Sequence, residues 1–448
     1  MRKAGYCSVF LAVLFLTQLG LAVDRQPNSD YRARRQALAA KSSGGAILLF
    51  APNESEGPNA IYGYRPDNDF FYLSGWIGPG AALLIVPSTE PSGKDPARAY
   101  SEILFLPAHN YAQEKWTGPK LGPENPQAAS ITGFDHVEVL DSMRDELVRL
   151  LPQMATIYTD VPAAGETSNS QTPLEWLNRA NAFPLRVSFR DIRPLLASLR
   201  TYKDAGEMDR IRKAVDASIA AHLAAMHNMK PGMNEREISA LMQYEWGRRG
   251  CERPAYAPIV GSGFNSTVLH YSDDSGVIQS GDVVVIDAAG EYSLYASDIT
   301  RTLPANGKFT ARQREIYDIV LGAQRAAIAA FKPGKSHLRR NLADSIHNVA
   351  YDYINTHGKD LHGEPLGKYF IHGLGHYVGL NVHDAGDYDV PLAPGMVFTI
   401  EPGIYIPEEK LGVRIEDMYY VDAGGKLIEL TEALPHTADE VEHAMAAR

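Results

Sequence analysis

The chain has 448 residues, of which 45% are hydrophobic and 22% charged, and this suits a globular protein with a large core and two or more domains. Its formal net charge is −11 and it contains no long basic run, which argues against nucleic acid and anionic membrane surfaces as partners. A small neutral or cationic ligand fits this charge better.

The first 22 residues have the composition of an export signal. Arg2 and Lys3 are basic, residues 9–21 are mostly apolar, and small residues precede an expected cleavage after Ala22. The apolar run is about a dozen residues, shorter than the ~20 that span a bilayer, so a retained membrane anchor is the less favoured alternative. We therefore expect export to the periplasm or the extracellular space, with no membrane contact after cleavage. Cys7 would leave with the signal, so Cys251 has no partner for an internal disulfide and is expected to be a small packing residue.

Residues 31–195 are predicted to form a separate α/β domain. Strand-like apolar runs at 46–50, 82–86 and 103–106 alternate with helical stretches such as 141–151. The domain boundary is expected at 196–204.

The second domain is predicted over residues 204–440, and it opens with a long amphipathic helix at 205–229. Later helices are expected between capping-box pairs and Pro-Gly steps. These signals are Asn234 with Glu237, Thr310 with Gln313, Pro231-Gly232 and Pro333-Gly334. We expect an α+β domain with helices outside and a curved sheet inside.

A strand pattern occurs twice in this domain and ends each time in a carboxylate. Gly281-Asp-Val-Val-Val-Ile-Asp287 returns as Gly395-Met-Val-Phe-Thr-Ile-Glu401. A Lys-Pro-Gly junction also recurs, and a histidine precedes each acid, His270 in the first unit and His383 in the second. The repetition predicts two related units with a pseudo-two-fold arrangement.

A second acid follows each strand after a short excursion: Asp298 after Asp287, and Glu416 after Glu401. Both second acids lie among apolar or β-branched neighbours, so each is predicted to occupy a strand position. The two-fold arrangement would bring four carboxylates together, and such a cluster repels itself unless cations neutralise it. The sequence therefore predicts a metal site.

Three histidines lie in the stretch His372-Gly-Leu-Gly-His376-Tyr-Val-Gly-Leu-Asn-Val-His383. Its glycines let the backbone approach a ligand closely. Three histidines beside four acids favour a functional site over ordinary core packing.

Together these motifs resemble the proline-specific metallopeptidases of the pita-bread fold, the aminopeptidase P and prolidase group. The resemblance extends to Asp-Ile-Thr-Arg-Thr302, Thr-Ile-Glu401-Pro-Gly-Ile-Tyr and Val-Arg-Ile-Glu416-Asp. Two amino-terminal stretches, 64–75 and 116–122, look like the non-catalytic domain of aminopeptidase P, so the resemblance covers about residues 30–440. The expected fold is an α/β domain followed by a pita-bread catalytic domain.

The resemblance implies five ligands for two divalent metal ions. They are Asp287, Asp298, His376, Glu401 and Glu416, with Asp298 and Glu416 bridging the ions. Four carboxylates and one imidazole suit Mn²⁺ better than a thiolate-rich zinc site would, although zinc or cobalt also binds such donors.

The expected chemistry follows from ions roughly 3.5–4 Å apart, which share a water that loses its proton near neutral pH. The hydroxide attacks the peptide carbonyl, and Glu401 carries the proton to the leaving nitrogen. By resemblance, His270 and His383 hold the substrate and stabilise the oxyanion.

Arg414 lies two residues before Glu416, so in a strand both side chains share a face and the guanidinium can orient the ligand carboxylates. Tyr405 is the matching candidate in the loop of the second unit. His372 and Tyr405 are the predicted substrate-binding residues.

One departure from the family concerns Pro119 and Lys120, where many members carry an arginine in a domain that reaches a neighbouring subunit's active site. Lysine does not reproduce a bidentate arginine contact. A homo-oligomer is expected, while a contribution of Lys120 to the site stays open.

The predicted function is release of the amino-terminal residue from peptides with proline in second position. Prolidase, which cuts Xaa-Pro dipeptides with the same metal centre, is the alternative. A non-catalytic peptide-binding protein is a further reading, disfavoured because all five ligand positions are filled. The Gly-x-Ser-x-Gly and His-Glu-x-x-His motifs are absent, which excludes those two hydrolase chemistries.

Overall fold

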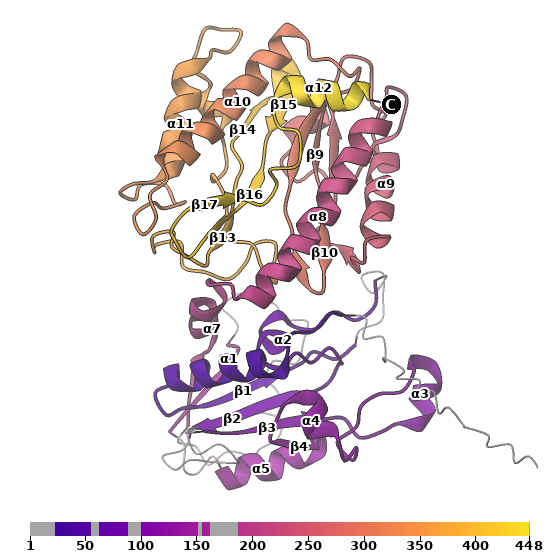
Figure 1. Cartoon of the computed structure of the whole chain (residues 1–448), viewed down its shortest axis with the longest axis vertical. Coiled ribbons are helices and arrows are strands. Elements are labelled where there is room, and N and C mark those ends of the chain that lie inside the picture. Colours follow the sequence, from indigo (N-terminus) through magenta and orange to yellow (C-terminus); the bar gives the residue numbers. More distant parts are fainter. Residues whose placement is uncertain (1–22, 55–61, 88–99, 151–154, 162–186, 448) are drawn as a thin grey trace, which may run out of the picture.

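The computed structural model describes residues 23–54, 62–87, 100–150, 155–161 and 187–447, which form two domains stacked along the long axis (Figure 1). The predicted export signal lies outside these residues. In the part of the chain that the structure describes, no helix is both long and apolar enough to cross a membrane.

The amino-terminal domain is built on a six-stranded mixed sheet in the order β4-β3-β2-β1-β5-β6. Its strands are β1 (Ala46–Phe50), β2 (Ala82–Pro87), β3 (Tyr100–Leu106), β4 (His136–Val139), β5 (Thr156–Thr159) and β6 (Ser188–Asp191). Its helices are α1 (Asn28–Lys41), α2 (Asn68–Ser74), α3 (Tyr111–Thr117), α4 (Ala128–Thr132), α5 (Met143–Leu150) and α7 (Arg193–Arg200), with a 3-10 turn at Leu140–Ser142. The three strands and the helix expected from the sequence are present, because their apolar runs pack into the buried sheet.

Buried ion pairs join the two domains. Arg200, at the end of α7, contacts Asp69 of the amino-terminal domain (2.6 Å) and Asp384 of the catalytic domain (2.5 Å). Arg65 reaches Glu291 of the catalytic domain at 2.8 Å. The loop that carries Asp384 is therefore held from the domain interface, which matters because His383 precedes it.

Each half of the catalytic domain places a helix pair outside a small sheet (Figure 1). The first half contains α8 (Ala205–Asn228), α9 (Glu235–Gly247), β7 (Arg253–Pro254), β8 (Ile259–Ser262), β9 (Val283–Asp287), β10 (Gly290–Tyr292), β11 (Tyr295–Ala296) and β12 (Thr300–Pro304). The second contains α10 (Ala311–Ala330), α11 (Ile346–His357), β13 (Val397–Ile400), β14 (Gly403–Ile406), β15 (Leu411–Arg414), β16 (Asp417–Val421) and β17 (Leu427–Glu429), followed by α12 (Ala438–Ala446). Short 3-10 turns lie at Gly263–Thr267, Leu366–Tyr369 and Pro407–Glu409. The expected capping pairs begin α9 and α10, each with both reciprocal hydrogen bonds.

The two halves use matching antiparallel pairs to present their acids. β9 pairs with β12 so that Asp287 faces Thr300, and β13 pairs with β16 so that Ile400, the residue before Glu401, faces Asp417. An isolated bridge between Thr300 and Glu416 connects the halves. The predicted pita-bread domain with its internal repeat is confirmed.

The prediction that Asp298 and Glu416 occupy strand positions is wrong in detail. Asp298 lies two residues before β12, and Glu416 lies between β15 and β16, paired only through the isolated bridge to Thr300. Both residues thus lie outside the regular ladders, and their carboxylate oxygens come together where the two halves meet.

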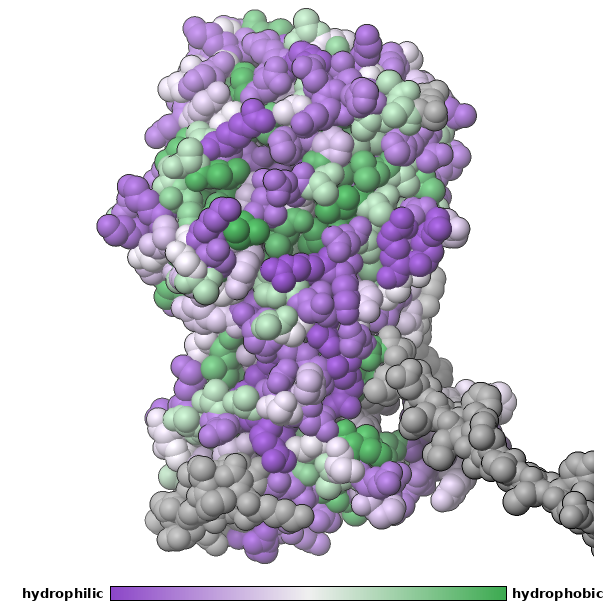
Figure 2. Space-filling model, viewed as in Figure 1, coloured by the Kyte–Doolittle hydropathy of each residue, from purple (hydrophilic) through white to green (hydrophobic). Residues whose placement is uncertain are grey.

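Charged and polar side chains cover most of the face in Figure 2, and apolar side chains gather on the middle of the catalytic domain. Beneath the surface, the apolar faces of both helix pairs pack on the sheets in one core that extends into the amino-terminal domain. Cys251 is buried in this core with a free thiol, as expected of a packing residue.

Candidate metal centre

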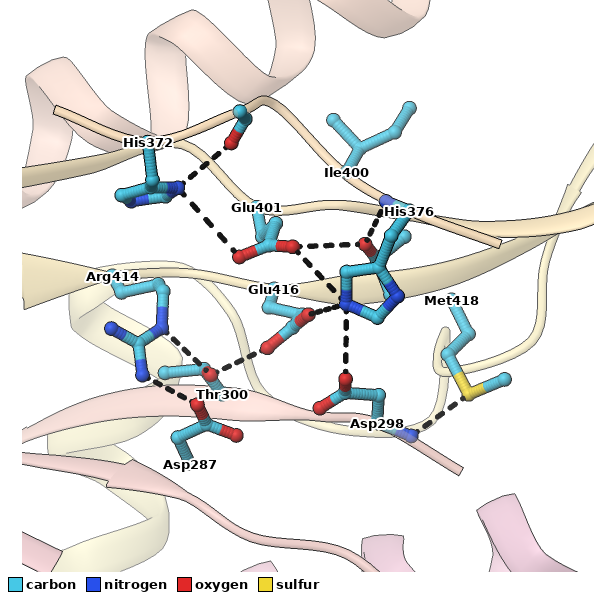
Figure 3. A network of polar contacts seen from close by, with 12 residues as sticks. Asp287, Asp298, Thr300, His372, His376, Ile400, Glu401, Arg414, Glu416 and Met418 are labelled. Atoms are coloured by element: carbon cyan, nitrogen blue, oxygen red, sulfur yellow. Dashed lines mark hydrogen bonds and ion pairs between the residues drawn. The ribbon is translucent and has the colours of Figure 1, made fainter. Parts of the chain in front are cut away.

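Side chains from the two acid-bearing hairpins and from the histidine-rich segment converge between the halves (Figure 3). One ligand atom from each of Asp298, His376 and Glu416 lies within 4.8 Å of the others, the spacing of a metal-binding group. The three residues come from three different segments, so the group exists only because the halves pack together.

His376 presents Nε2 to the acids. This nitrogen lies 3.2 Å from Asp298 Oδ2, 3.4 Å from Glu401 Oε1 and 3.9 Å from Glu416 Oε1. Its Nδ1 is 3.1 Å from the Tyr377 carbonyl oxygen, a contact that fixes the ring as outer partners do for metal-binding histidines. Burial opposes protonation, but the hydrogen bond to Asp298 and the charge of Glu401 prevail and raise the pKa of His376 to about 9. The ring nitrogen thus lies where a cation is stabilised.

Arg414 and Tyr256 hold the first-half acids from behind. Arg414 Nη2 donates to Asp287 Oδ2 at 2.5 Å, and Arg414 Nε donates to the Thr300 hydroxyl at 3.1 Å. The Thr300 hydroxyl donates in turn to Glu416 Oε2 at 2.6 Å.

The Tyr256 hydroxyl lies 2.6 Å from one oxygen of Asp287 and 2.6 Å from one of Asp298, so a single proton is shared between two carboxylates. The expectation that Arg414 orients carboxylates agrees with these contacts, although its main partner is Asp287.

Glu401 has fewer partners. Thr399 donates its hydroxyl proton to Glu401 Oε1 at 3.1 Å, while the Glu401 backbone N–H donates to the Leu374 carbonyl. Burial first, and then the charge of Asp298, raise the pKa of Glu401 to about 7, although His376 opposes the shift. A carboxyl group with a pKa near neutrality is suited to accept and release a proton.

Burial also raises the pKa of Asp287, and raises that of Glu416 well above its ordinary value. The neighbouring carboxylates add to both shifts, while Arg414 opposes them. Crowded, buried acids of this kind are stabilised by divalent cations. All five predicted ligands offer oxygen or imidazole nitrogen, and the buried thiol of Cys251 is not among the groups assembled here. The residues therefore fit hard divalent ions.

His372 is a neutral imidazole held by two contacts. Its Nδ1 lies 2.7 Å from the Gly373 carbonyl oxygen and its Nε2 lies 2.9 Å from the Tyr405 hydroxyl, so Nδ1–H donates and Nε2 accepts. Burial, aided by the charge of Arg414, lowers the pKa of His372 to about 3. Arg414 Nη1 also donates to the Tyr405 oxygen at 2.9 Å.

The predicted substrate-binding residue Tyr405 therefore lies behind His372. It is 2% exposed, and we expect it to orient His372 and Arg414 rather than to touch substrate.

A cavity of about 620 Å³ gives access to these groups, and its lining includes His270, His372 and His383 together with the five predicted ligands. The His383 ring lies 4.2 Å from the His376 ring, edge to face. Both non-ligand histidines thus come from the positions that the repeat predicts, one from each half. Lys120 is exposed on the amino-terminal domain and does not line this cavity.

Sequence reasoning missed Tyr256, Thr300 and Thr399. The two threonines had a signal, because each lies two residues from a ligand, Thr300 from Asp298 and Thr399 from Glu401. Tyr256 had none, since it belongs to a short segment before β8 that reaches the acids only in the folded domain.

Comparison with known proteins identifies both domains. Residues 209–423 match the model of metallopeptidase family M24, and residues 31–158 match that of the aminopeptidase P amino-terminal domain. An Xaa-Pro aminopeptidase of Escherichia coli is 33% identical over 93% of this chain and 98% of its own length. Xaa-Pro aminopeptidase 3 of Homo sapiens is 32% identical over 88% of this chain and 80% of its own.

Solved structures agree over nearly the whole chain. Proline aminopeptidase P II from Yersinia pestis is 32% identical with a TM-score of 0.81, covering 94% of this chain and 100% of that one. The aminopeptidase P of Escherichia coli with the inhibitor Pro-Leu is 31% identical with a TM-score of 0.81, covering 95% and 99%. The assembled site and both matching domains agree: the chain belongs to the aminopeptidase P family of M24 metallopeptidases and is a metal-dependent aminopeptidase.

Proposed function

We propose that this enzyme removes the amino-terminal residue from peptides with proline in second position, cutting the Xaa-Pro bond. The proposal rests on one observation above all: the five predicted ligands, Glu401 among them, line one cavity together with His270 and His383 from matching positions of the halves. The Xaa-Pro specificity is supported by relatives of that name at 32–33% identity.

Two divalent ions are proposed, with Mn²⁺ preferred because the donors are four carboxylates and one imidazole. Asp287, Asp298, His376, Glu401 and Glu416 would hold them. When bound, such ions supply the Lewis acidity that activates a water molecule and polarises the scissile carbonyl.

The side chains then have distinct tasks. Glu401, which lines the cavity beside His376, would accept the proton of the attacking water and deliver it to the proline nitrogen as the bond breaks. His270 and His383 line the cavity where they can donate hydrogen bonds to the substrate carbonyl oxygen. Arg414 keeps Asp287 in place throughout, because its guanidinium remains charged.

We also propose that residues 1–22 direct export and are removed after Ala22. Amino-terminal sequencing of the secreted protein tests this, with residue 23 expected first.

The enzyme is further proposed to be a homo-oligomer. Light scattering tests this, and a monomer mass would contradict it.

A substrate panel tests the specificity. At saturating Mn²⁺ we expect Ala-Pro-Ala to be cut between Ala and Pro with a higher kcat/KM than Ala-Pro, and Ala-Ala-Ala to be a poor substrate. The tertiary amide before proline needs a dedicated site, and a free carboxylate on proline would lie close to the acids. Preference for the dipeptide would reassign the enzyme to prolidase, and equal cleavage of Ala-Ala-Ala would remove the proline requirement.

A further inference from the structure

A second groove, of about 880 Å³, adjoins the metal cavity. Gly373, Gly375 and Tyr388 line both, so the two spaces meet at the histidine-rich segment. Beyond this junction, the groove runs between α7 and residues 338–341 of the segment that joins α10 to α11. α7 itself lies at the junction of the two domains (Figure 1).

The chemistry of an aminopeptidase decides which part of a peptide can enter this groove. Only one residue lies on the amino-terminal side of the cut, and the metal cavity must contain it together with the scissile bond. Everything that extends out of the cavity therefore belongs to the leaving fragment. An extended peptide advances roughly 3.3–3.6 Å per residue, so a few residues beyond proline suffice to enter an adjoining groove.

The groove contains two exposed arginines with different partners. Arg339 is paired with Asp389 at 2.5 Å. Arg340 Nη2 donates to the His372 carbonyl oxygen at 2.8 Å, and within the described ranges no carboxylate pairs with it. Asp387 also lines the groove, and its Oδ1 accepts the Asp389 backbone N–H at 2.9 Å. Of the two groove arginines, Arg340 is thus the one without a carboxylate partner among the described residues, and its contact to the backbone of His372 places it beside the metal cavity.

The junction itself leaves room for a peptide. A methyl group built on Gly373 would meet no atom within 4 Å, whereas one on Gly375 would lie 2.0 Å from the Thr399 carbonyl oxygen. Gly375 is therefore needed for close packing, while the open space over Gly373 is part of the passage between the two spaces.

We propose that Arg340 is a specificity-determining residue that binds a carboxylate of the leaving fragment, and that the groove beside it receives the peptide beyond proline. The carboxylate is either the free carboxyl terminus of a short peptide or an acidic side chain of a longer one. This inference rests on the proposed Xaa-Pro activity and deepens it: it predicts a preference for short or acidic peptides that the metal centre, itself rich in acids, does not explain.

The test compares matched substrates that differ only in the carboxylate. One pair is Ala-Pro-Ala-Ala with a free terminus and the same peptide as its amide; the other is Ala-Pro-Glu-Ala-amide and Ala-Pro-Gln-Ala-amide. For the wild-type enzyme we expect the anionic member of at least one pair to have a kcat/KM about 3- to 10-fold higher, mainly through KM, as for a partly exposed charge-assisted contact. The pair that shows the difference identifies the source of the carboxylate.

Arg340→Gln should abolish this difference while leaving kcat/KM for the amide and glutamine peptides unchanged. Arg339→Gln is the matched control, because Arg339 lies in the same groove but is already paired, and it should retain the difference. If Arg340 had a purely structural role, Arg340→Gln would lower kcat/KM equally for all four substrates. The inference is overturned by equal rates for both wild-type pairs, or by an undiminished difference in Arg340→Gln. If the wild-type enzyme cuts none of the four peptides, the proposed function itself is refuted.

Discussion

The two halves of the catalytic domain present their acids on the same scaffold but hold them differently. Asp287, at the end of β9, is fixed by the guanidinium of Arg414 and the hydroxyl of Tyr256. Glu401, just after β13, receives one side-chain hydrogen bond, from Thr399, and faces His376. Duplication of a strand thus provided two carboxylates, and the supporting residues differ: Asp287 has two side-chain donors, whereas Glu401 has one.

The supporting helices differ in a parallel way. His222 of α8 and Gln324 of α10 each lie eight residues before a Lys-Pro-Gly junction, at 230 and 332. His222 Nε2 lies 3.0 Å from the Ala288 carbonyl oxygen beside Asp287, and Gln324 Nε2 donates to the Ile400 carbonyl beside Glu401 at 3.0 Å. Equivalent positions in the repeat therefore support the ends of both acid strands, one with a titratable group and one without.

The largest effect is expected from His376 and Glu416, which meet Asp298 where the two halves come together. His376→Ala and Glu416→Gln should each lower metal occupancy and activity together, by on the order of 10³-fold in kcat/KM or more, beyond the ~10–100-fold typical of losing an outer partner. Elemental analysis and peptide hydrolysis on the same samples check this. Normal metal content with lost activity would show that these residues are not ligands.

Glu401→Gln should separate proton transfer from metal binding. With metal restored to saturation, turnover is expected to fall ~10²–10⁴-fold, the range for a general acid–base group, because the amide cannot accept the proton. Asp287→Asn is the matched variant of the first half. Added metal should restore a larger part of its lost turnover than of the turnover lost in Glu401→Gln. Near-normal turnover of Glu401→Gln at full occupancy contradicts the assignment.

The supporting residues should differ in importance between the halves. Arg414→Lys keeps the charge but loses the forked contacts to Asp287, Thr300 and Tyr405, so we expect metal affinity to fall ~10–100-fold. Thr399→Val removes, at nearly constant shape, the hydroxyl that donates to Glu401 and accepts the His376 backbone N–H, and a change of about 2–10-fold is expected. Titration against a competing chelator measures both. Equal losses would mean that the two halves hold their acids equally firmly.

The smallest expected effect concerns stability against acid. Burial lowers the pKa of His222 from 6.5 to about 3, with Arg301 contributing. The folded state therefore keeps the ring neutral while the unfolded chain protonates it below 6.5. Stability from this group is fully present above pH 6.5 and declines by ~1.4 kcal/mol per pH unit as the pH falls toward 3.

His222→Gln, which installs the residue found at the equivalent position of the second half, should reduce the loss of unfolding free energy between pH 7.5 and 5.5. Denaturant titrations with excess chelator measure that loss. The exposed His227 on the same helix provides the control His227→Gln, which should behave as the wild type. If His222→Gln loses as much unfolding free energy between pH 7.5 and 5.5 as the wild type does, His222 is not the cause of that loss.

Much of the fold and site could be predicted because the repeat is visible in the chain. The paired acid-bearing strands, the capping boxes and the histidine-rich segment are local patterns with direct structural consequences. The placement of Asp298 and Glu416 outside the ladders was not predictable, since it depends on the bridge between Thr300 and Glu416 that forms only when the halves meet. Tyr256 was missed because its contacts to Asp287 and Asp298 form only in the folded domain. The burial of Tyr405 behind His372 likewise depends on tertiary contacts to His372 and Arg414.

Metal titration of the purified enzyme tests most directly whether two cations shared between the halves create the activity. The protein is stripped with chelator, verified by elemental analysis, and titrated with Mn²⁺ while hydrolysis of Ala-Pro-Ala is followed. We expect no hydrolysis without metal and a plateau of activity at two ions per chain, because the four carboxylates alone repel one another and cannot activate water. Full activity of the metal-free enzyme, or a plateau at one ion with no second binding step, would contradict this arrangement.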